Sequence, residues 1–340
     1  MAIFQPGVSA FPAGYKPLLD LYETQDAIGR LKRIFAEELS DRLNLKRVSA
    51  PLFVDPQSGL NDDLSGVERA VSFDIPSAAC RGEVVHSLAK WKRLALQRYD
   101  FFPNKGLYTD MNAIRREEEL DNYHSIYVDQ WDWELVVQAT QRNFQTVQIV
   151  VEQIHTAIRH TSERLRYKYP QLPKIGDGEI FFVSAAELES LKPDMSPDER
   201  EDWIARDKGA AFIHGIGYPL ESGAPHSRRA PDYDDWNLNG DIVFYDDVCC
   251  KAMELSSMGM RVDPEQMDKQ LSFANCDHRR ELSFHRMLLA GELPQTIGGG
   301  IGQSRLSMLL LGKAHIGEVQ SSIWDKQTEE AAKLAGVTLL

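Results

Sequence analysis

Apolar residues recur at intervals of three and four over two long stretches of the chain. This spacing puts them on one face of a helix, which can then pack on a core. The first stretch predicts a helix that Thr24 caps, with core positions Ile28, Leu31, Phe35, Leu39 and Leu43. The second predicts a long helix over about residues 134–167, with core positions Phe144, Val147, Val151, Ile154 and Ile158.

Shorter signals predict further helices. A helical run follows Ser87 and includes Leu88, Trp91, Leu94 and Ala95. Ser196-Pro197-Asp198-Glu199 is a capping box with proline in the first turn, and Asp263-Pro264 is another helix start. Gly291 is typical of the residue at which a helix ends.

Strand-like segments lie between these helices. They cover residues 46–51, where Pro51 ends the strand, and residues 82–86, 107–115, 125–133, 179–184, 210–216, 241–245 and 253–261. Several follow one another without a crossover helix, which favours antiparallel pairing. The sequence therefore predicts an α+β fold, with a mostly antiparallel β-sheet flanked by helices. No long polar linker divides the chain, so we expect a single domain over residues 1–340, with residues 1–20 as a loosely attached lead.

Composition excludes several classes of protein. The 340 residues are 43% hydrophobic, enough for a large core. A net charge of −13 disfavours the broad basic face of a nucleic-acid-binding protein. No apolar run approaches the length of about 18 residues that spans a membrane, and the first residues do not resemble an export signal. The four cysteines lack CxxC spacing and are expected to be reduced, so we expect a cytoplasmic protein with no nucleic-acid or membrane partner.

A glycine-rich segment carries the first chemical signal. Residues 298–302 contain four glycines and are followed by Arg305 and an apolar helical run. With so few side chains, a flat ligand can lie against the main chain, and the N-terminus of the following helix favours an anion. A nucleotide fits both properties. The alternative is a glycine-rich turn that leads into a core helix.

A second group of polar residues surrounds the segment that predicts a strand at 125–133. With a period of two, Gln130 and Asp132 point to one face and Asp129, Trp131 and Trp133 to the other. The carboxylate of Asp132 suits an ammonium group. Alternatively, the acids of this strand are solvated, and Arg115 pairs only with the acids that follow it.

Two acidic residues fall in strands that otherwise look buried. Asp241 lies on one apolar strand and Glu254 on another, with Ser256, Ser257 and Arg261 beyond it. Buried carboxylates need a cation. Magnesium with a polyphosphate meets this need, and so does a local arginine.

Three motifs in order resemble those of class II aminoacyl-tRNA synthetases. They are a helix with a strand that ends at Pro51, then Arg115-x-Glu117, then the glycine-rich segment that ends at Arg305. Most of the chain further resembles the ammonia-dependent asparagine synthetases, the aspartate–ammonia ligase family. The segments that carry this resemblance are 62–66, 85–93, 127–133, 229–236, 239–241, 254–259 and 295–305. The resemblance implies a synthetase-like catalytic core and a homodimer joined through the first motif.

The family resemblance also implies a reaction. It is the ATP-dependent amidation of L-aspartate by ammonia to L-asparagine, through a β-aspartyl-adenylate, with release of AMP and pyrophosphate. ATP would be the co-substrate and Mg²⁺ the metal, bound by Asp241 and Glu254. The implied ATP-binding residues are Arg115, Glu117, Asp241, Glu254, Ser257, Gly302 and Arg305.

The implied aspartate site uses a different set of side chains. Lys92 and Arg261 match the pair that grips the carboxylate remote from the reaction, Asp132 suits the ammonium, and Gln130 suits the reacting carboxyl. Ser256 is a further substrate-binding residue, and Asp62 and Asp234 are expected to hold ammonia and collect protons. The implied catalytic residues are Arg115, Gln130, Arg305, Asp62 and Asp234.

Two other functions remain open from the sequence. A free-standing aspartyl- or asparaginyl-tRNA synthetase-like enzyme would need an anticodon-binding module and a basic RNA-binding face, and the acidic composition argues against it. A catalytically silent nucleotide-binding paralogue is disfavoured because the arginines, acids and lysine of the implied site are all present.

Overall fold

A central sheet organises the fold of the protein. The structure is a computed structural model that describes residues 7–64 and 68–340. Within these residues, eight strands pair in the order β1-β5-β6-β11-β10-β9-β8-β7. Their bounds are β1 Leu45–Arg47, β5 Gly106–Ile114, β6 Tyr127–Val136, β7 Phe181–Ser184, β8 Ala210–His214, β9 Asp234–Asp246, β10 Lys251–Arg261 and β11 Thr296–Gly302. Only the outermost pairs, β1 with β5 and β7 with β8, are parallel. The predicted α+β fold with a mostly antiparallel sheet is thereby confirmed.

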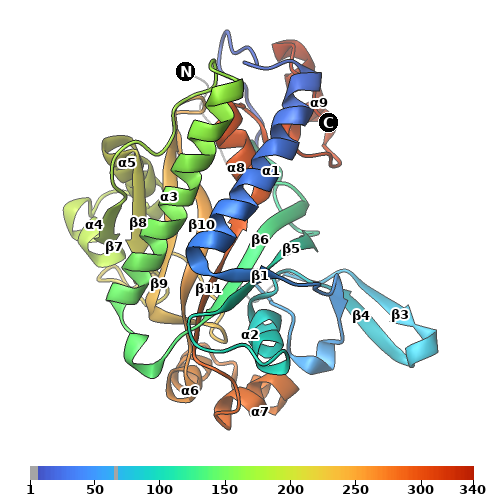
Figure 1. Ribbon diagram of the computed structural model, residues 1–340, viewed down its shortest axis with the longest axis vertical. Helices are drawn as coiled ribbons and strands as arrows, with labels where there is room; N and C mark the ends of the chain where they lie inside the picture. Colours follow the sequence, from blue (N-terminus) through green and yellow to red (C-terminus); the bar gives the residue numbers. More distant parts are fainter. Residues whose placement is uncertain (1–6, 65–67) are drawn as a thin grey trace.

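Two long helices cover one face of this sheet. Helices α1 (Leu21–Leu43) and α3 (Phe144–Lys168) lie side by side across it, next to α8 (Gln303–Leu311) (Figure 1). The main core lies between these helices and the sheet, and it includes Phe35, Trp131 and Trp133. The predicted alternation along the strand at 125–133 is confirmed for its two tryptophans.

The starts of both long helices differ from the prediction. Asp20, not Thr24, is the N-cap of α1, in a capping box with Glu23, while the Thr24 hydroxyl donates to the Asp20 carbonyl at 2.6 Å. The long helix begins at Phe144 with Asn143 as its cap. Residues 134–136 instead continue β6, because hydrogen bonding to β5 and β11 outweighs the local helical pattern.

The opposite face of the sheet carries α2 (Ala89–Arg98), which packs with α6 (Pro264–Phe273) and α7 (Ser283–Leu289) on a second core around Leu94, Leu107 and Phe284. A third core lies beneath α4 (Ala185–Leu191) and α5 (Pro197–Lys208). Ser196 caps α5 in a capping box, Asp263 caps α6, and Gly291 has φ +75° just beyond α7, so these three predictions are confirmed.

A small sheet projects from the body of the molecule (Figure 1). Its strands are β2 (Phe53–Val54), β3 (Ser72–Ile75) and β4 (Cys80–Val84), in the order β2-β4-β3. The strand predicted over residues 46–51 is shorter in the structure, where β1 covers only Leu45–Arg47. Helix α9 (Lys326–Ala335) lies near the C-terminus. None of the helices in residues 7–64 and 68–340 is long and apolar enough to cross a membrane.

The N-terminal lead is only partly covered. Residues 1–6 lie outside the described part of the chain, as do Ser65 and Gly66 of the 62–66 segment. In the rest of the lead, Ser9 bonds to His315 at 2.9 Å, and the Tyr15 hydroxyl donates to Glu318 at 3.0 Å. The single domain and the loose attachment of residues 1–20 stay predictions.

Candidate active site

A cavity of about 360 Å³ opens on the face of the sheet that carries α2. Strands β6, β10 and β11 form its floor, and the loop around Asp62 and the segment 228–234 contribute to its walls. Eleven of the predicted site residues line it: Asp62, Lys92, Arg115, Gln130, Asp132, Asp234, Glu254, Ser257, Arg261, Gly302 and Arg305. The fold therefore brings together residues from segments spread over most of the chain.

The glycine-rich segment is a central strand, β11, paired with β6 on one side and β10 on the other. The alternative of a simple turn is therefore wrong. A Cβ added at Gly298 would lie 2.0 Å from Glu134 Oε2, and one added at Gly300 would lie 2.3 Å from Gln130 Oε1. These two glycines thus make room for side chains of the protein itself. At Gly302 the nearest atom would be Arg305 Cβ, at 3.4 Å, so of these three glycines Gly302 leaves the most open main chain toward the cavity.

Lys92 is fully buried at the α2 side of the cavity. Its ammonium group contacts the carboxylate of Asp132, donates to the Gly299 carbonyl at 3.0 Å and lies 3.9 Å from Glu134 Oε2. Burial lowers the pKa of Lys92, against the opposing effect of Asp132. Lys92 and Asp132, predicted to hold opposite ends of one ligand, therefore also hold each other.

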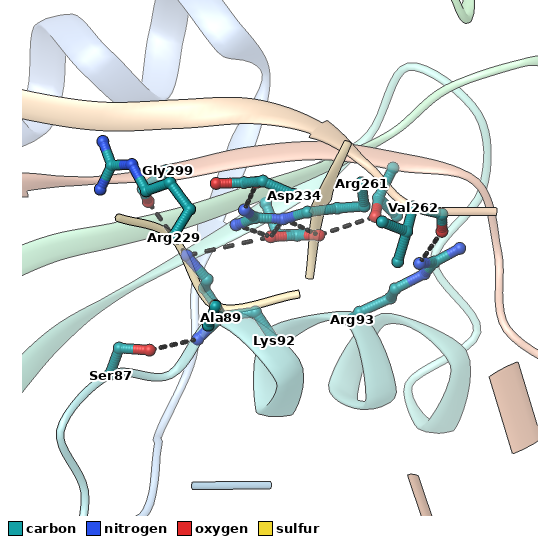
Figure 2. A network of polar contacts seen from close by, with 12 residues as sticks. Ser87, Ala89, Lys92, Arg93, Arg229, Asp234, Arg261, Val262 and Gly299 are labelled. Atoms are coloured by element: carbon teal, nitrogen blue, oxygen red, sulfur yellow. Dashed lines mark hydrogen bonds and ion pairs between the residues drawn. The ribbon is translucent and has the colours of Figure 1, made fainter. Parts of the chain in front are cut away.

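Arg261 is the second buried cation of the cavity. It donates to Glu134 through Nε at 3.0 Å and Nη2 at 2.7 Å, and its Nη1 contacts Asp234. Figure 2 shows Lys92 rising from α2 toward Arg261 and Asp234. Around these two cations the structure places three carboxylates, those of Asp132, Glu134 and Asp234.

Glu134 is a site residue that the sequence analysis missed. It is fully buried and also accepts from the Thr296 hydroxyl at 2.7 Å. Burial alone would raise the pKa of Glu134, but Arg261 and Lys92 outweigh it and hold that pKa below its ordinary value. The signal was available, because Glu134 continues the period-two face of Gln130 and Asp132, but the predicted strand ended at residue 133, three residues before the end of β6.

The other end of the cavity carries arginines and acids. Arg305 lies in the first turn of α8, as predicted, and its Nη1 donates to the Glu254 carbonyl at 3.0 Å and lies 3.6 Å from Glu254 Oε2. Arg115 Nη1 lies 3.8 Å from Glu118 Oε2. Both guanidinium groups line the cavity, next to the N-terminus of a helix, so this end suits an anion.

Asp241 lies behind this end of the cavity rather than on its surface. Arg229, which does line the cavity, forms an ion pair with it. Burial, opposed by Arg229 and reinforced by Glu254, raises the pKa of Asp241 to about 7. Two carboxylates are suitable hard-oxygen ligands for magnesium. No group of three His, Cys, Asp or Glu side chains among the described residues forms a metal site, so phosphate and water oxygens would have to complete the shell.

Two other predicted residues lie outside the cavity lining. Glu117 accepts from the main-chain N–H of Arg69 at 2.8 Å and pairs with its side chain. Ser256 lies opposite Ile301 in the β10–β11 ladder, so it faces the helix layer of α1 and α3, and its hydroxyl has no partner among the described residues. A bulge between Glu254 and Ser256 changes the facing of β10, and a strict period of two does not predict this.

Known proteins resemble the chain over nearly its whole length. A family model described as aspartate-ammonia ligase matches residues 22–336. An aspartate–ammonia ligase of Clostridium perfringens is 54% identical over 330 residues, which cover 97% of this chain and 98% of the relative. One of Clostridium tetani is 55% identical over 330 residues, with 97% of each chain covered.

Solved structures resemble the fold. An asparaginyl-tRNA synthetase from Pyrococcus horikoshii, complexed with asparaginyl-adenylate, superposes with a TM-score of 0.63 and 13% identity, over 88% of this chain and 68% of that one. An aspartyl-tRNA synthetase from Entamoeba histolytica gives a TM-score of 0.57 and 15% identity, over 89% and 59% of the two chains. The predicted class II synthetase-like core is thereby confirmed.

Proposed function

The chain belongs to the aspartate–ammonia ligase family, and from this premise we propose that it makes L-asparagine from L-aspartate, ammonia and ATP through a β-aspartyl-adenylate. One observation supports the route most directly. The buried pair Lys92 and Arg261 and the two arginines Arg115 and Arg305 line one cavity. Along β6, Gln130 lies opposite Gly302, next to the arginine end, and two residues before Asp132, which contacts Lys92. A substrate anchored by its α-carboxylate at the first end would present its β-carboxylate toward the nucleotide at the second.

The chemistry explains why both ends are needed. A carboxylate is a poor acyl donor, so a β-carboxylate oxygen attacks the α-phosphorus of ATP and pyrophosphate leaves with the bonding electrons. Ammonia nitrogen then attacks the acyl carbon, AMP leaves, and the nitrogen loses a proton. Negative charge develops first on the phosphoryl oxygens and then on the acyl oxygen, where fixed cations and hydrogen-bond donors stabilise it.

At the nucleotide end, we assign Arg115 to the α-phosphate and Arg305 to the outer phosphates. Ser257, Gly302 and the first turn of α8 complete this wall. Asp241 and Glu254 would hold Mg²⁺, which neutralises phosphate charge when bound. Arg229 must then give up its ion pair with Asp241, or share that carboxylate with the metal.

At the aspartate end, Lys92 and Arg261 bind the α-carboxylate, Asp132 binds the substrate ammonium, and Gln130 donates to the reacting carboxyl. Glu134 keeps the two cations in place and limits their net charge. Asp62 and Asp234 would hold ammonia and accept its proton. Both are buried carboxylates at the cavity wall, and burial raises the pKa of Asp234, which favours proton uptake.

We also propose a cytoplasmic homodimer joined through α1 and the β1 segment. The family resemblance suggests this pairing. In its support, Leu21 and Tyr22 at the start of α1 are exposed, and the four cysteines are free thiols.

Product analysis tests the reaction. Purified protein with ATP, Mg²⁺, aspartate and ammonium should form asparagine, AMP and pyrophosphate in equal amounts, and glutamine should not replace ammonium. ADP and phosphate as products would contradict the adenylate. Aminoacylation of total tRNA would indicate a tRNA synthetase, and a failure of aspartate to trigger pyrophosphate release would indicate a silent paralogue.

Arginine variants test the nucleotide end. Arg115→Ala or Arg305→Ala should lower turnover by about 10²–10³-fold with little change in folding, because each removes a charged donor at the phosphates. Arg115→Lys should restore only part of the activity, since an ammonium lacks the planar fork of arginine. If Arg115→Ala catalysed pyrophosphate exchange at the wild-type rate, the only role of Arg115 would be its ion pair with Glu118.

Substrate analogues test the orientation of aspartate. 3-Aminopropanoate lacks the α-carboxylate and should not support pyrophosphate release, and aspartate α-amide should fail for the same reason. Lys92→Met should weaken the binding of aspartate and asparagine by roughly 2–5 kcal/mol. The roles of Lys92 and Arg261 would be overturned if the protein activated aspartate α-amide as readily as aspartate, and if Lys92→Met bound aspartate and asparagine as tightly as wild type.

A further inference from the structure

A fully buried carboxylate lies just outside the cavity and takes no part in the chemistry above. Asp232 Oδ2 accepts from Lys90 Nζ at 3.0 Å, from Arg279 Nη1 at 2.9 Å and from His285 Nε2 at 2.9 Å. Burial would raise the pKa of Asp232, but Lys90, His285 and Arg279 hold it well below its ordinary value. Three donors on one oxygen make this residue a fixed anchor.

The three donors come from different parts of the fold. Lys90 lies on α2, two residues before Lys92, and His285 lies on α7. Arg279 lies on the 3₁₀ turn Asp277–Glu281 between α6 and α7. Asp232 itself belongs to the segment 228–234, which contributes Tyr233 and Asp234 to the cavity wall. The cluster therefore holds one wall of the cavity against the helices beneath it.

Arg279 extends this anchor to the opposite wall. Its second terminal nitrogen, Nη2, contacts the carboxylate of Asp63, the neighbour of Asp62. Asp62 lines the cavity, where its side chain accepts from the Ser87 hydroxyl at 2.9 Å and from the Leu64 main-chain N–H at 3.0 Å. A chain of ionic contacts, Asp63–Arg279–Asp232, thus joins the loop that carries Asp62 to the segment that carries Asp234.

The two contacts of this chain differ in exposure. The Asp63 side chain is 45% exposed, whereas those of Arg279 and Asp232 are 8% and 0% exposed. A partly exposed ion pair contributes little to folding, so cutting the Asp63 contact removes a positional restraint and leaves the buried cluster intact. An ångström-sized displacement of a reacting group is nevertheless enough to slow catalysis strongly.

We propose that Arg279 is a positioning residue that, through Asp63, sets the place of Asp62 for the ammonia-dependent step. The inference rests on the proposed function, in which Asp62 holds ammonia. It separates the two half-reactions: adenylate formation needs the nucleotide and aspartate ends of the cavity, which Arg279 does not touch, whereas amidation needs Asp62 in register with Asp234.

The test uses the full chain and two readouts. In Asp63→Asn and in Arg279→Met, the KM for ammonium in asparagine formation should rise by about 10–100-fold, the scale of an ångström-sized misplacement. Aspartate-dependent pyrophosphate exchange, measured without ammonium, should stay within about twofold of wild type in Asp63→Asn, which leaves the contact between Arg279 and Asp232 intact. The double variant should be no worse than Arg279→Met, because Arg279→Met already cuts the Asp63 contact, together with the contact to Asp232. The matched control is Arg280→Met, whose arginine lies on the same turn but pairs with Asp268 and Asp277.

The outcomes distinguish this inference from the proposed function. If Asp62→Asn raises the KM for ammonium but Asp63→Asn and Arg279→Met do not, the positioning role is overturned and the proposed function stands. If pyrophosphate exchange falls as much as amidation in Asp63→Asn, the contact serves only the fold, and the positioning role is again overturned. If Arg279→Met does not fold, Asp63→Asn decides alone. If the wild-type protein makes no asparagine, both fail.

Discussion

Replacing Gly298 with alanine should damage the aspartate end of the cavity from beneath. The added Cβ would lie 2.0 Å from Glu134 Oε2 and 2.6 Å from Arg261 Nη2. Ordinary contacts exceed 3.0 Å, so the carboxylate must move by about 1 Å, which is enough to disrupt the hydrogen bonds between Glu134 and Arg261.

The size of the effect follows from three terms. Overpacking a core costs about 1–3 kcal/mol, and breaking a buried ion pair costs about 3–5 kcal/mol. Alanine is more favourable than glycine within a strand by about 0.5–1 kcal/mol. Because the displacement separates the pair, we expect the free energy of unfolding to fall by about 3–7 kcal/mol and aspartate binding to weaken with it.

Urea unfolding and titration calorimetry with aspartate measure both effects. Gly302→Ala is the matched control on the same face of β11, since its Cβ would meet only the Arg305 side chain, with Cβ nearest at 3.4 Å. Its stability should stay within about 0.5 kcal/mol of wild type. Wild-type stability and aspartate affinity in Gly298→Ala would refute the view that this glycine exists to accommodate the Glu134–Arg261 pair.

Three further predictions concern pH, metal binding and helix stability. Burial, with a smaller effect of Arg159, lowers the pKa of His155 to about 4, so the folded state takes up its proton at lower pH than the unfolded state. His155 should therefore contribute fully to the free energy of unfolding above pH 6.5, and this contribution should fall by up to about 1.4 kcal/mol per pH unit between pH 6.5 and pH 4. In urea unfolding, the free energy of unfolding should differ less between pH 5 and pH 7.5 in His155→Met than in wild type, and an equal difference would contradict this. Arg229→Met removes the cation paired with Asp241, so the nucleotide-free variant should bind Mn²⁺ about tenfold more tightly than wild type. Electron paramagnetic resonance at pH 8.5 measures this binding, and weaker binding would show that Arg229 supports the metal site. Gly29 is exposed on α1 and a Cβ there meets no described atom within 4 Å, so Gly29→Ala should stabilise the protein by about 1 kcal/mol in urea, and a loss of stability would reveal a contact that the structure does not contain.

Local patterns in the sequence determined much of the fold. The capping box at Ser196, the cap at Asp263 and the apolar stripe of α1 act within a few residues, so they can be identified before any tertiary contact is known. The facing of Gln130 and Asp132 follows from the same short-range geometry of a strand. The antiparallel sheet also follows, because consecutive strands without crossover helices have few other ways to pair.

Only the tertiary structure decided what the site residues touch. β11 is a strand because β6 and β10 supply hydrogen bonds on both sides, and a glycine-rich segment has no strand propensity of its own to indicate this. Glu134 and Arg261 are 127 residues apart in sequence, and Arg279 and Asp63 are 216 apart. Such ion pairs form because burial forces each charge to find a partner. Which partner it finds depends on the packing of the whole chain, and no local pattern encodes that.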